Sequence, residues 1–168
     1  MIIVCPLSCL ADTVAEHRAR HVVTLLASGA PATPPGIEPG NHLVVDVDDI
    51  CDPLDGYCAP DARHIEALLA FGERWDRSSP LVIHCWAGIS RSTAAAFATA
   101  CARAPRRDEE EIAWAIRRAS PTAMPNARIV ALADALLGRG GRMSRAIDMI
   151  GPGRPAFEGL PFRLAVDG

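Results

Sequence analysis

Short apolar runs alternate with longer stretches of helical periodicity along the first half of the chain, and helical periodicity continues alone in the second half. Short runs rich in β-branched residues predict strands, namely Ile2–Cys5, Val22–Leu26, His42–Val47 and Leu81–Cys85. Apolar positions spaced as on one helix face predict helices, namely Asp12–Arg20, Asp61–Trp75, Arg91–Arg103, Asp108–Ala119, Asn126–Leu137 and Met143–Ile150. We therefore expect an α/β fold, with a central, mostly parallel sheet of four to five strands flanked by helices and a helical C-terminal half.

The chain length of 168 residues suits one domain with its own hydrophobic core. Prolines and glycines interrupt the periodicity over residues 27–41, which we interpret as a loop, and over residues 151–168, where no element is predicted. We expect residues 1–168 to form a single domain, with residues 151–168 as a C-terminal extension.

Composition argues against several classes of function. The net charge of −3 provides no basic surface for a nucleic acid. The apolar N-terminus lacks a leading positive charge and is interrupted by Pro6, so neither a signal peptide nor a membrane span is expected. The six cysteines include no C-x-x-C pair, so we expect no metal site but reduced thiols in the cytoplasm. Nothing in the sequence indicates a cofactor or an oligomeric state.

The most informative segment joins the predicted strand ending at Cys85 to the predicted helix beginning at Arg91. Between them lie Trp86, Ala87, Gly88, Ile89 and Ser90. A loop that leads into a helix N-terminus turns backbone N–H groups inward and binds a tetrahedral anion. Gly88 permits a backbone conformation that a side chain would obstruct, and the planar guanidinium of Arg91 can bind two phosphate oxygens.

The same surroundings favour Cys85 as a nucleophile. Helix N-termini, inward amides and a neighbouring guanidinium stabilise a thiolate, which can attack a bound phosphate monoester. Ser92 is placed to donate a hydrogen bond to the sulfur when it departs in a second step. We expect His84 to orient the loop rather than to act as a base.

The run His84-Cys85-x-x-Gly88-x-x-Arg91-Ser92 resembles the signature loop of the protein tyrosine phosphatase superfamily at every defining position. The mid-chain cysteine differs from the low-molecular-weight and rhodanese-like members, and the chain is too short for receptor-type domains. The closest resemblance is to the compact dual-specificity-like branch, including bacterial tyrosine phosphatases. Pro125-Asn126-x-x-Ile129-x-x-Leu132 resembles the helix start that follows the signature there, although an aromatic residue is usual at Ile129. The resemblance covers residues 43–137.

The resemblance implies a phosphocysteine intermediate and a carboxylic acid on a loop before the cysteine. That acid protonates the leaving oxygen and then, as a carboxylate, activates water. The candidates are Asp46, Asp48, Asp49, Asp52 and Asp55. We take Asp49 as the acid because it follows a predicted strand and because Asp48-Asp49-Ile50 resembles the turn at that place in the family. Asp52, directly before Pro53, is the alternative.

The resemblance also implies a phosphorylated protein or a small aryl phosphate as substrate. No basic residue lies between Cys85 and Arg91, which disfavours a phosphoinositide. Trp86 favours an aryl group such as that of phosphotyrosine, with packing beneath the loop as an equal alternative. The choice between phosphotyrosine and dual specificity stays open.

Two other classes of function use the same loop. One is a phosphate-binding pseudophosphatase without turnover. The other is a sulfurtransferase or an arsenate reductase. The five-residue loop argues against the sulfurtransferase, and the lack of a relay cysteine near Cys85 argues against the reductase.

Overall fold

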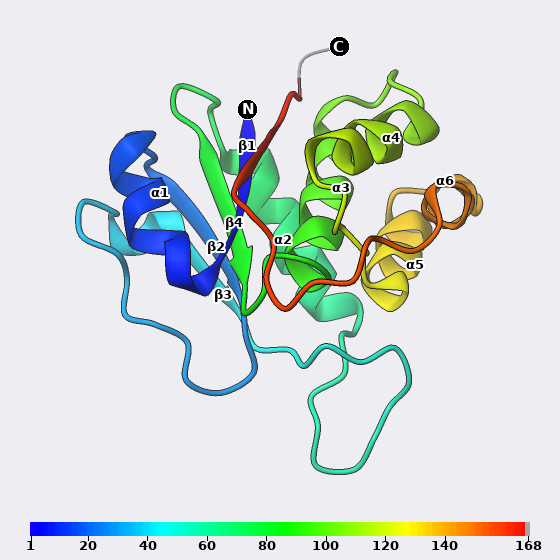
Figure 1. The fold of residues 1–168 in the computed structure, drawn as a ribbon, viewed down its shortest axis with the longest axis horizontal. Helices are drawn as coiled ribbons and strands as arrows, with labels where there is room; N and C mark the ends of the chain where they lie inside the picture. The colour runs from blue at the N-terminus through cyan, green and yellow to red at the C-terminus, as the bar shows by residue number, and fades with distance from the viewer. Residues whose placement is uncertain (167–168) are drawn as a thin grey trace.

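The computed structural model describes residues 1–166 and is built around a five-stranded sheet in the order β3-β2-β4-β1-β5 (Figure 1). The strands are β1 Ile2–Pro6, β2 His21–Leu25, β3 His42–Val45, β4 Leu81–Cys85 and β5 Phe162–Leu164. The first four are mutually parallel, and β5 runs antiparallel to β1 at the edge. The predicted α/β architecture with a mostly parallel sheet is confirmed.

Helices cover both faces of this sheet (Figure 1). They are α1 Leu10–Glu16, α2 Ala62–Arg74, α3 Arg91–Arg103, α4 Glu109–Ala119, α5 Ala127–Leu136 and α6 Arg142–Ile150, with short 3₁₀ turns η1 Leu7–Cys9 and η2 Pro39–Asn41. α1 packs on one face, whereas α2 to α6 form a larger layer on the other. None of the helices in residues 1–166 is long and apolar enough to cross a bilayer.

The three inner strands β1, β2 and β4 are buried on both faces, as a parallel sheet between two helical layers requires. In β4, Ile83 and Cys85 point into the large core beneath α2 to α6, and Val82 points into the smaller core beneath α1. Because β4 is the central strand, its carboxyl end opens between β1 and β2. This is the place where open α/β sheets bind ligands.

Two predicted elements end at least two residues earlier than expected. The helix predicted over Asp12–Arg20 ends at Glu16, because Arg18 has a left-handed backbone with φ of 49°. The strand predicted over His42–Val47 ends at Val45, because β3 is an edge strand and its pairing with β2 stops where β2 ends. The released segment after β3 then runs toward the carboxyl end of β4.

The C-terminal segment, where no element was predicted, contributes β5. After α6 the chain passes the carboxyl end of β4 and pairs with β1 (Figure 1, red). The strand has three residues between proline- and glycine-rich stretches, which is too short for a periodic signal. Residues 167 and 168 of the predicted extension lie outside the described part of the chain.

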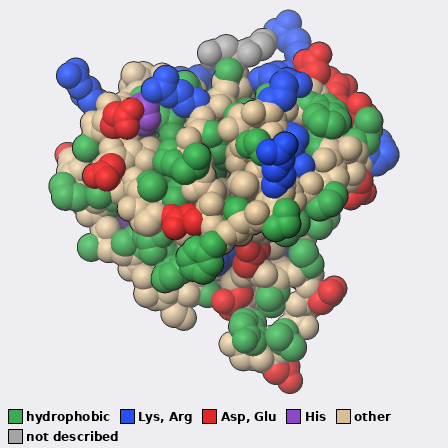
Figure 2. Space-filling view, in the orientation of Figure 1, with side chains coloured by type: hydrophobic (Ala, Val, Ile, Leu, Met, Phe, Trp, Pro, Cys, Tyr) green, Lys and Arg blue, Asp and Glu red, His purple; other side chains and the backbone are tan. Residues whose placement is uncertain are grey.

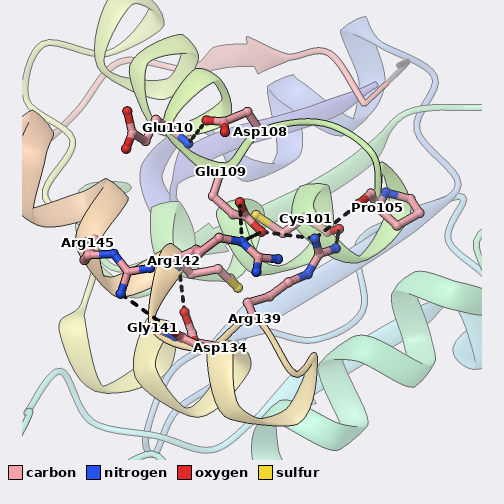
Figure 3. A network of polar contacts seen from close by, with 12 residues as sticks. Cys101, Pro105, Asp108, Glu109, Glu110, Asp134, Arg139, Gly141, Arg142 and Arg145 are labelled. Carbon is pink, nitrogen blue, oxygen red and sulfur yellow. Dashed lines mark hydrogen bonds and ion pairs between the residues drawn. The ribbon is translucent and has the colours of Figure 1, made fainter.

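A buried carboxylate holds the helical half together (Figure 3). Glu109, the first residue of α4, accepts hydrogen bonds from Arg139 at 3.0 Å and from Arg142 at 3.2 Å. Arg139 also donates to the Cys101 carbonyl in α3 at 2.8 Å. Nearby, Asp134 accepts from the backbone N–H groups of Gly141 and Met143 where α6 begins. The contacts join α3, α4, α5 and α6 into one layer.

Candidate active site

Cys85 is the last residue of β4 and is 2% exposed. The loop of residues 86–90 follows, and α3 begins at Arg91. The Sγ atom of Cys85 lies 3.1 Å from the Oγ atom of Ser92 in the first turn of that helix. The hydroxyl is therefore within reach to donate a hydrogen bond to the sulfur, the role expected for Ser92.

The carbonyl groups of the loop point outward and are held from three directions. The donors are Leu7 N to Trp86 O at 3.1 Å, Gly159 N to Ala87 O at 2.8 Å, Met124 N to Ile89 O at 2.9 Å and Asn126 N to Ser90 O at 3.3 Å. The backbone N–H groups of residues 86–90 donate no hydrogen bond to any other residue between 1 and 166. With carbonyls fixed outward and N–H groups unpaired, the loop forms a nest for an anion.

Gly88 is required by the close packing of this loop on β1. Its φ is +68°, a conformation that L side chains rarely adopt. A Cβ atom there would lie 2.7 Å from the Pro6 nitrogen and 2.9 Å from the Cys5 carbonyl carbon. Neither backbone atom can move without disturbing β1, so any side chain at position 88 would displace the loop.

Arg91 is almost buried, with 9% of its surface exposed. Its Nη1 donates to the Val47 carbonyl at 2.8 Å, which fixes the guanidinium plane. Its Nε is buried without a hydrogen-bond partner in the described chain and lies 3.9 Å from Asp49 Oδ2. The guanidinium lines the same pocket as Cys85 and keeps a donor for an anion there.

Asp49 lies at this pocket, although it is 36 residues before Cys85 in the sequence. Its Oδ1 accepts hydrogen bonds from Ser90 Oγ at 2.7 Å and from Asn126 Nδ2 at 2.9 Å. Asp52 does not line the pocket. Asp48 instead closes its own loop by accepting from the Cys58 backbone N–H at 2.8 Å.

The N-cap residue and a first-turn residue of α5 position the loop that carries Asp49, and sequence reasoning missed this role. Asn126 caps α5 by accepting from Ile129 N at 3.1 Å, and its amide donates to Asp49. Arg128 donates to the carbonyls of Cys51 at 3.1 Å and Pro60 at 2.5 Å. The Pro125-Asn126 motif was the available signal, but it indicated only a helix start.

His84 is fully buried between β4 and β2, where its Nε2 lies 2.7 Å from Thr24 Oγ1. Thr24 Oγ1 also lies 2.8 Å from His42 Nε2 in β3. Burial lowers the pKa of His84 to about 4, so its ring is neutral at physiological pH. A neutral, buried imidazole bound to the neighbouring strand is suited to hold the end of β4 in place.

The pocket has a volume of about 280 Å³ and an apolar rim. Its lining residues are Asp49, Cys85, Trp86, Ala87, Ile89, Ser90, Arg91, Met124, Ala156 and Phe157. Trp86 is 62% exposed and so stands at the mouth rather than beneath the loop. Ala156 and Phe157 come from the C-terminal segment and were not anticipated. Hydrophobic side chains are exposed at the lower edge of the face in Figure 2, where this segment passes the end of β4.

Several solved phosphatase structures have the same fold. DUSP15 matches with a TM-score of 0.65 at 18% identity, over 87% of this chain and 89% of that chain. The PTP-2 phosphatase of Cydia pomonella matches with a TM-score of 0.61 at 22% identity, over 79% and 83%. The Yvh1 phosphatase domain from Chaetomium thermophilum matches with a TM-score of 0.59 at 20% identity, over 83% and 91%. No family model and no curated protein matches the chain.

The chain therefore has the same α/β fold as these phosphatases. This confirms the fold expected from the signature loop. The five-stranded sheet and the helical layer after the loop are shared with phosphatases whose sequences are only about one-fifth identical.

Proposed function

We propose that this chain is a phosphomonoesterase that hydrolyses phosphotyrosine-type substrates through a phosphocysteine intermediate. The observation that carries the proposal is the convergence of Cys85, Arg91 and Asp49 on one pocket, beside a nest of unpaired backbone N–H groups among residues 1–166. A thiol nucleophile, a fixed guanidinium and a carboxyl group are the groups that phosphoryl transfer through sulfur requires.

In the first step, the thiolate of Cys85 attacks phosphorus and the bond from phosphorus to the ester oxygen breaks. The nest and Arg91 stabilise charge on the three non-bridging oxygens. Asp49 gives its proton to the leaving oxygen, so an alcohol or phenol departs rather than an alkoxide or phenolate.

In the second step, water attacks the phosphocysteine. Asp49, now a carboxylate, takes a proton from the water while the sulfur–phosphorus bond breaks. Ser92, 3.1 Å from Sγ, donates a hydrogen bond to the departing sulfur. Inorganic phosphate is released, the thiolate of Cys85 is regenerated, and Asp49 is protonated for the next cycle.

The geometry favours this function over the alternatives that share the loop. A pseudophosphatase would lack an acid, whereas Asp49 lines the pocket with Cys85. A reductase needs a second reactive thiol beside the nucleophile, whereas Cys85 is the only cysteine among the residues that line the pocket. Of the buried cysteines, Cys5 and Cys101 both have a pKa raised by burial to about 12. All six cysteines are free, which fits a thiol enzyme of a reducing compartment such as the cytoplasm.

Hydrolysis of p-nitrophenyl phosphate by the unchanged chain and by the Cys85→Ser variant tests the proposal. We expect the unchanged chain to release phosphate and to yield a covalent phosphoenzyme, detectable by mass after acid quenching. Cys85→Ser should lose both while still binding inorganic phosphate, because Arg91 and the nest are unaltered. Phosphate binding without hydrolysis by the unchanged chain would favour the pseudophosphatase, and residual turnover by Cys85→Ser would overturn the nucleophile assignment.

A further inference from the structure

The C-terminal segment between α6 and β5 is fastened to the body of the protein before and after its closest approach to the pocket. Before it, Arg117 donates to the carbonyls of Gly151 and Pro152 at 2.8 Å, and Arg154 N donates to Pro121 O at 2.8 Å. After it, Gly159 N donates to the Ala87 carbonyl, and β5 pairs with β1. The segment is therefore held in place mainly through its own backbone groups.

Glycine permits this close approach at two points. A Cβ atom on Gly153 would lie 2.5 Å from the Thr122 carbonyl oxygen, and one on Gly159 would lie 3.2 Å from the Gly88 carbonyl oxygen. The first distance is shorter than any normal contact of a Cβ atom, and the second is at the short limit of such contacts. A side chain at either position would therefore push the segment away from the body of the protein. Between them, Ser8 Oγ donates to the carboxylate of Glu158.

The side chain presented at the pocket by this fixed backbone is the phenyl group of Phe157. It is 89% exposed, although Phe is among the residues most often buried. Trp86 is 62% exposed and Met124 is 52% exposed, and all three line the same pocket. They come from three separate stretches of the chain, so their meeting here is a property of the fold.

The positions of Cys85 and Arg91 determine which part of a bound substrate would contact Phe157, Trp86 and Met124. With a phosphate in the nest, the ester oxygen must point away from Sγ for in-line attack, and the attached group then leaves through the mouth of the pocket. An aryl ring emerging there meets aromatic and thioether surfaces, which form favourable contacts with aromatic rings. A short alkyl chain would leave them exposed to water.

We propose that Phe157 is a specificity-determining residue, which with Trp86 and Met124 forms an apolar rim for the aromatic ring of an aryl phosphate monoester such as phosphotyrosine. This inference rests on the proposed function and names the residue that gives it a preference for aryl substrates. It assigns the C-terminal segment a part in substrate recognition, outside the signature loop. One substrate molecule fills both places: its phosphate binds in the nest, and its organic group contacts the rim.

The test compares Phe157→Ala with Leu160→Ala in the full chain. Leu160 is 82% exposed and lies on the same segment, but it does not line the pocket. For phosphotyrosine we expect Phe157→Ala to raise KM roughly tenfold, the effect of losing one aromatic contact and the apolar area it covers. kcat, KM for O-phosphoserine and inhibition by inorganic phosphate should stay unchanged. Phe157→Tyr should restore KM, and Leu160→Ala should match the unaltered chain.

An unchanged KM in Phe157→Ala would overturn the inference, and so would an equal loss for phosphotyrosine, phosphoserine and phosphate. Equilibrium binding to Cys85→Ser separates this outcome from failure of the proposed function. Even if the unaltered chain hydrolyses nothing, we expect Cys85→Ser to bind phosphotyrosine more tightly than phosphoserine. That preference should disappear when Phe157→Ala is added. Equal binding of both ligands would contradict the role of the rim.

Discussion

Asp49 and Arg91 share the pocket without a direct hydrogen bond between them. The shortest contact is 3.9 Å, from Arg91 Nε to Asp49 Oδ2, which is too long for a hydrogen bond. Oδ1 is already occupied by donors from Ser90 and Asn126. Oδ2 is therefore the oxygen available to carry a proton, and Arg91 Nε remains available to a phosphate oxygen.

This division of roles predicts how Asp49→Asn behaves. Asparagine can keep the hydrogen bond from Ser90 but cannot donate a proton to the leaving oxygen. The rate should therefore fall most for substrates whose leaving group must be protonated. We expect kcat for phenyl phosphate to fall by roughly 10² to 10⁴, the usual contribution of a general acid. The fall for p-nitrophenyl phosphate should be much smaller, because p-nitrophenolate leaves without protonation.

Asp52→Asn is the matched control, since it removes a carboxylate from the same loop outside the pocket. It should leave both rates within about twofold of the unaltered chain, as for a surface substitution. A leaving-group dependence that appears in Asp52→Asn and not in Asp49→Asn would transfer the acid role to Asp52.

At the scale of elements, the start of α5 supports the loop that carries Asp49, the proposed acid. Arg128 bridges the carbonyls of Cys51 and Pro60, so one side chain joins the two ends of the loop that projects from the body (Figure 1). Asn126 holds Asp49 itself. Because Asn126 caps α5 and Arg128 lies in its first turn, Asp49, the proposed acid, is positioned by a rigid element although it lies in a loop.

We therefore expect Arg128→Gln to act as a loss of positioning. With the loop less constrained, kcat for phenyl phosphate should fall roughly ten- to a hundredfold, as small misplacements of a catalytic group do. Inhibition by inorganic phosphate should not change, because Arg128 does not line the pocket that binds it. Arg118→Gln removes an exposed arginine elsewhere and should have no effect. Equal losses of phosphate binding and kcat would instead indicate general disturbance of the fold.

The sequence predicts an element well when the residues that determine it are close together along the chain. The junction from Leu81 to Arg103 was predicted with both ends correct, because strand, glycine loop and helix are contiguous. Asp49 was placed at the end of its strand by resemblance, but its bonds to Ser90 and Asn126 join segments far apart in the chain. β5 and Phe157 left no signal, because the partners that order them are β1 and the loop rather than their sequence neighbours.

At the scale of the whole molecule, the loop is supported from both ends of the chain. Leu7, just after β1, and Gly159, just before β5, each donate to one of its carbonyls. The segment near Met124 supplies a third support, from the helical layer. The sheet and the helices thus meet at the anion nest, so the stability of the helical layer bears directly on the shape of the site.

Within that layer, the buried carboxylate of Glu109 forms ion pairs with Arg139 and Arg142 (Figure 3). Burial favours the neutral form of Glu109, but the hydrogen bond from Arg142 and the charges of both arginines outweigh it. The pKa of Glu109 therefore lies below its usual value of 4.5. A carboxyl group with a lowered pKa stabilises the fold fully above its unfolded pKa and loses that contribution as the pH falls through its folded value.

We predict that Glu109→Gln lowers the free energy of unfolding at pH 7 by about 3 kcal/mol, the lower end for breaking a buried ion pair. The lower end applies because Arg139 keeps carbonyl partners in Pro105 and Cys101. Urea unfolding of both chains between pH 7 and pH 3 measures the effect. The difference between them should be constant down to about pH 5 and shrink below it. Glu110→Gln removes an exposed carboxylate from the same turn of α4 and should cost less than about 1 kcal/mol. A Glu109→Gln deficit that persisted unchanged at pH 3 would show that the loss comes from packing rather than from the ionised carboxylate.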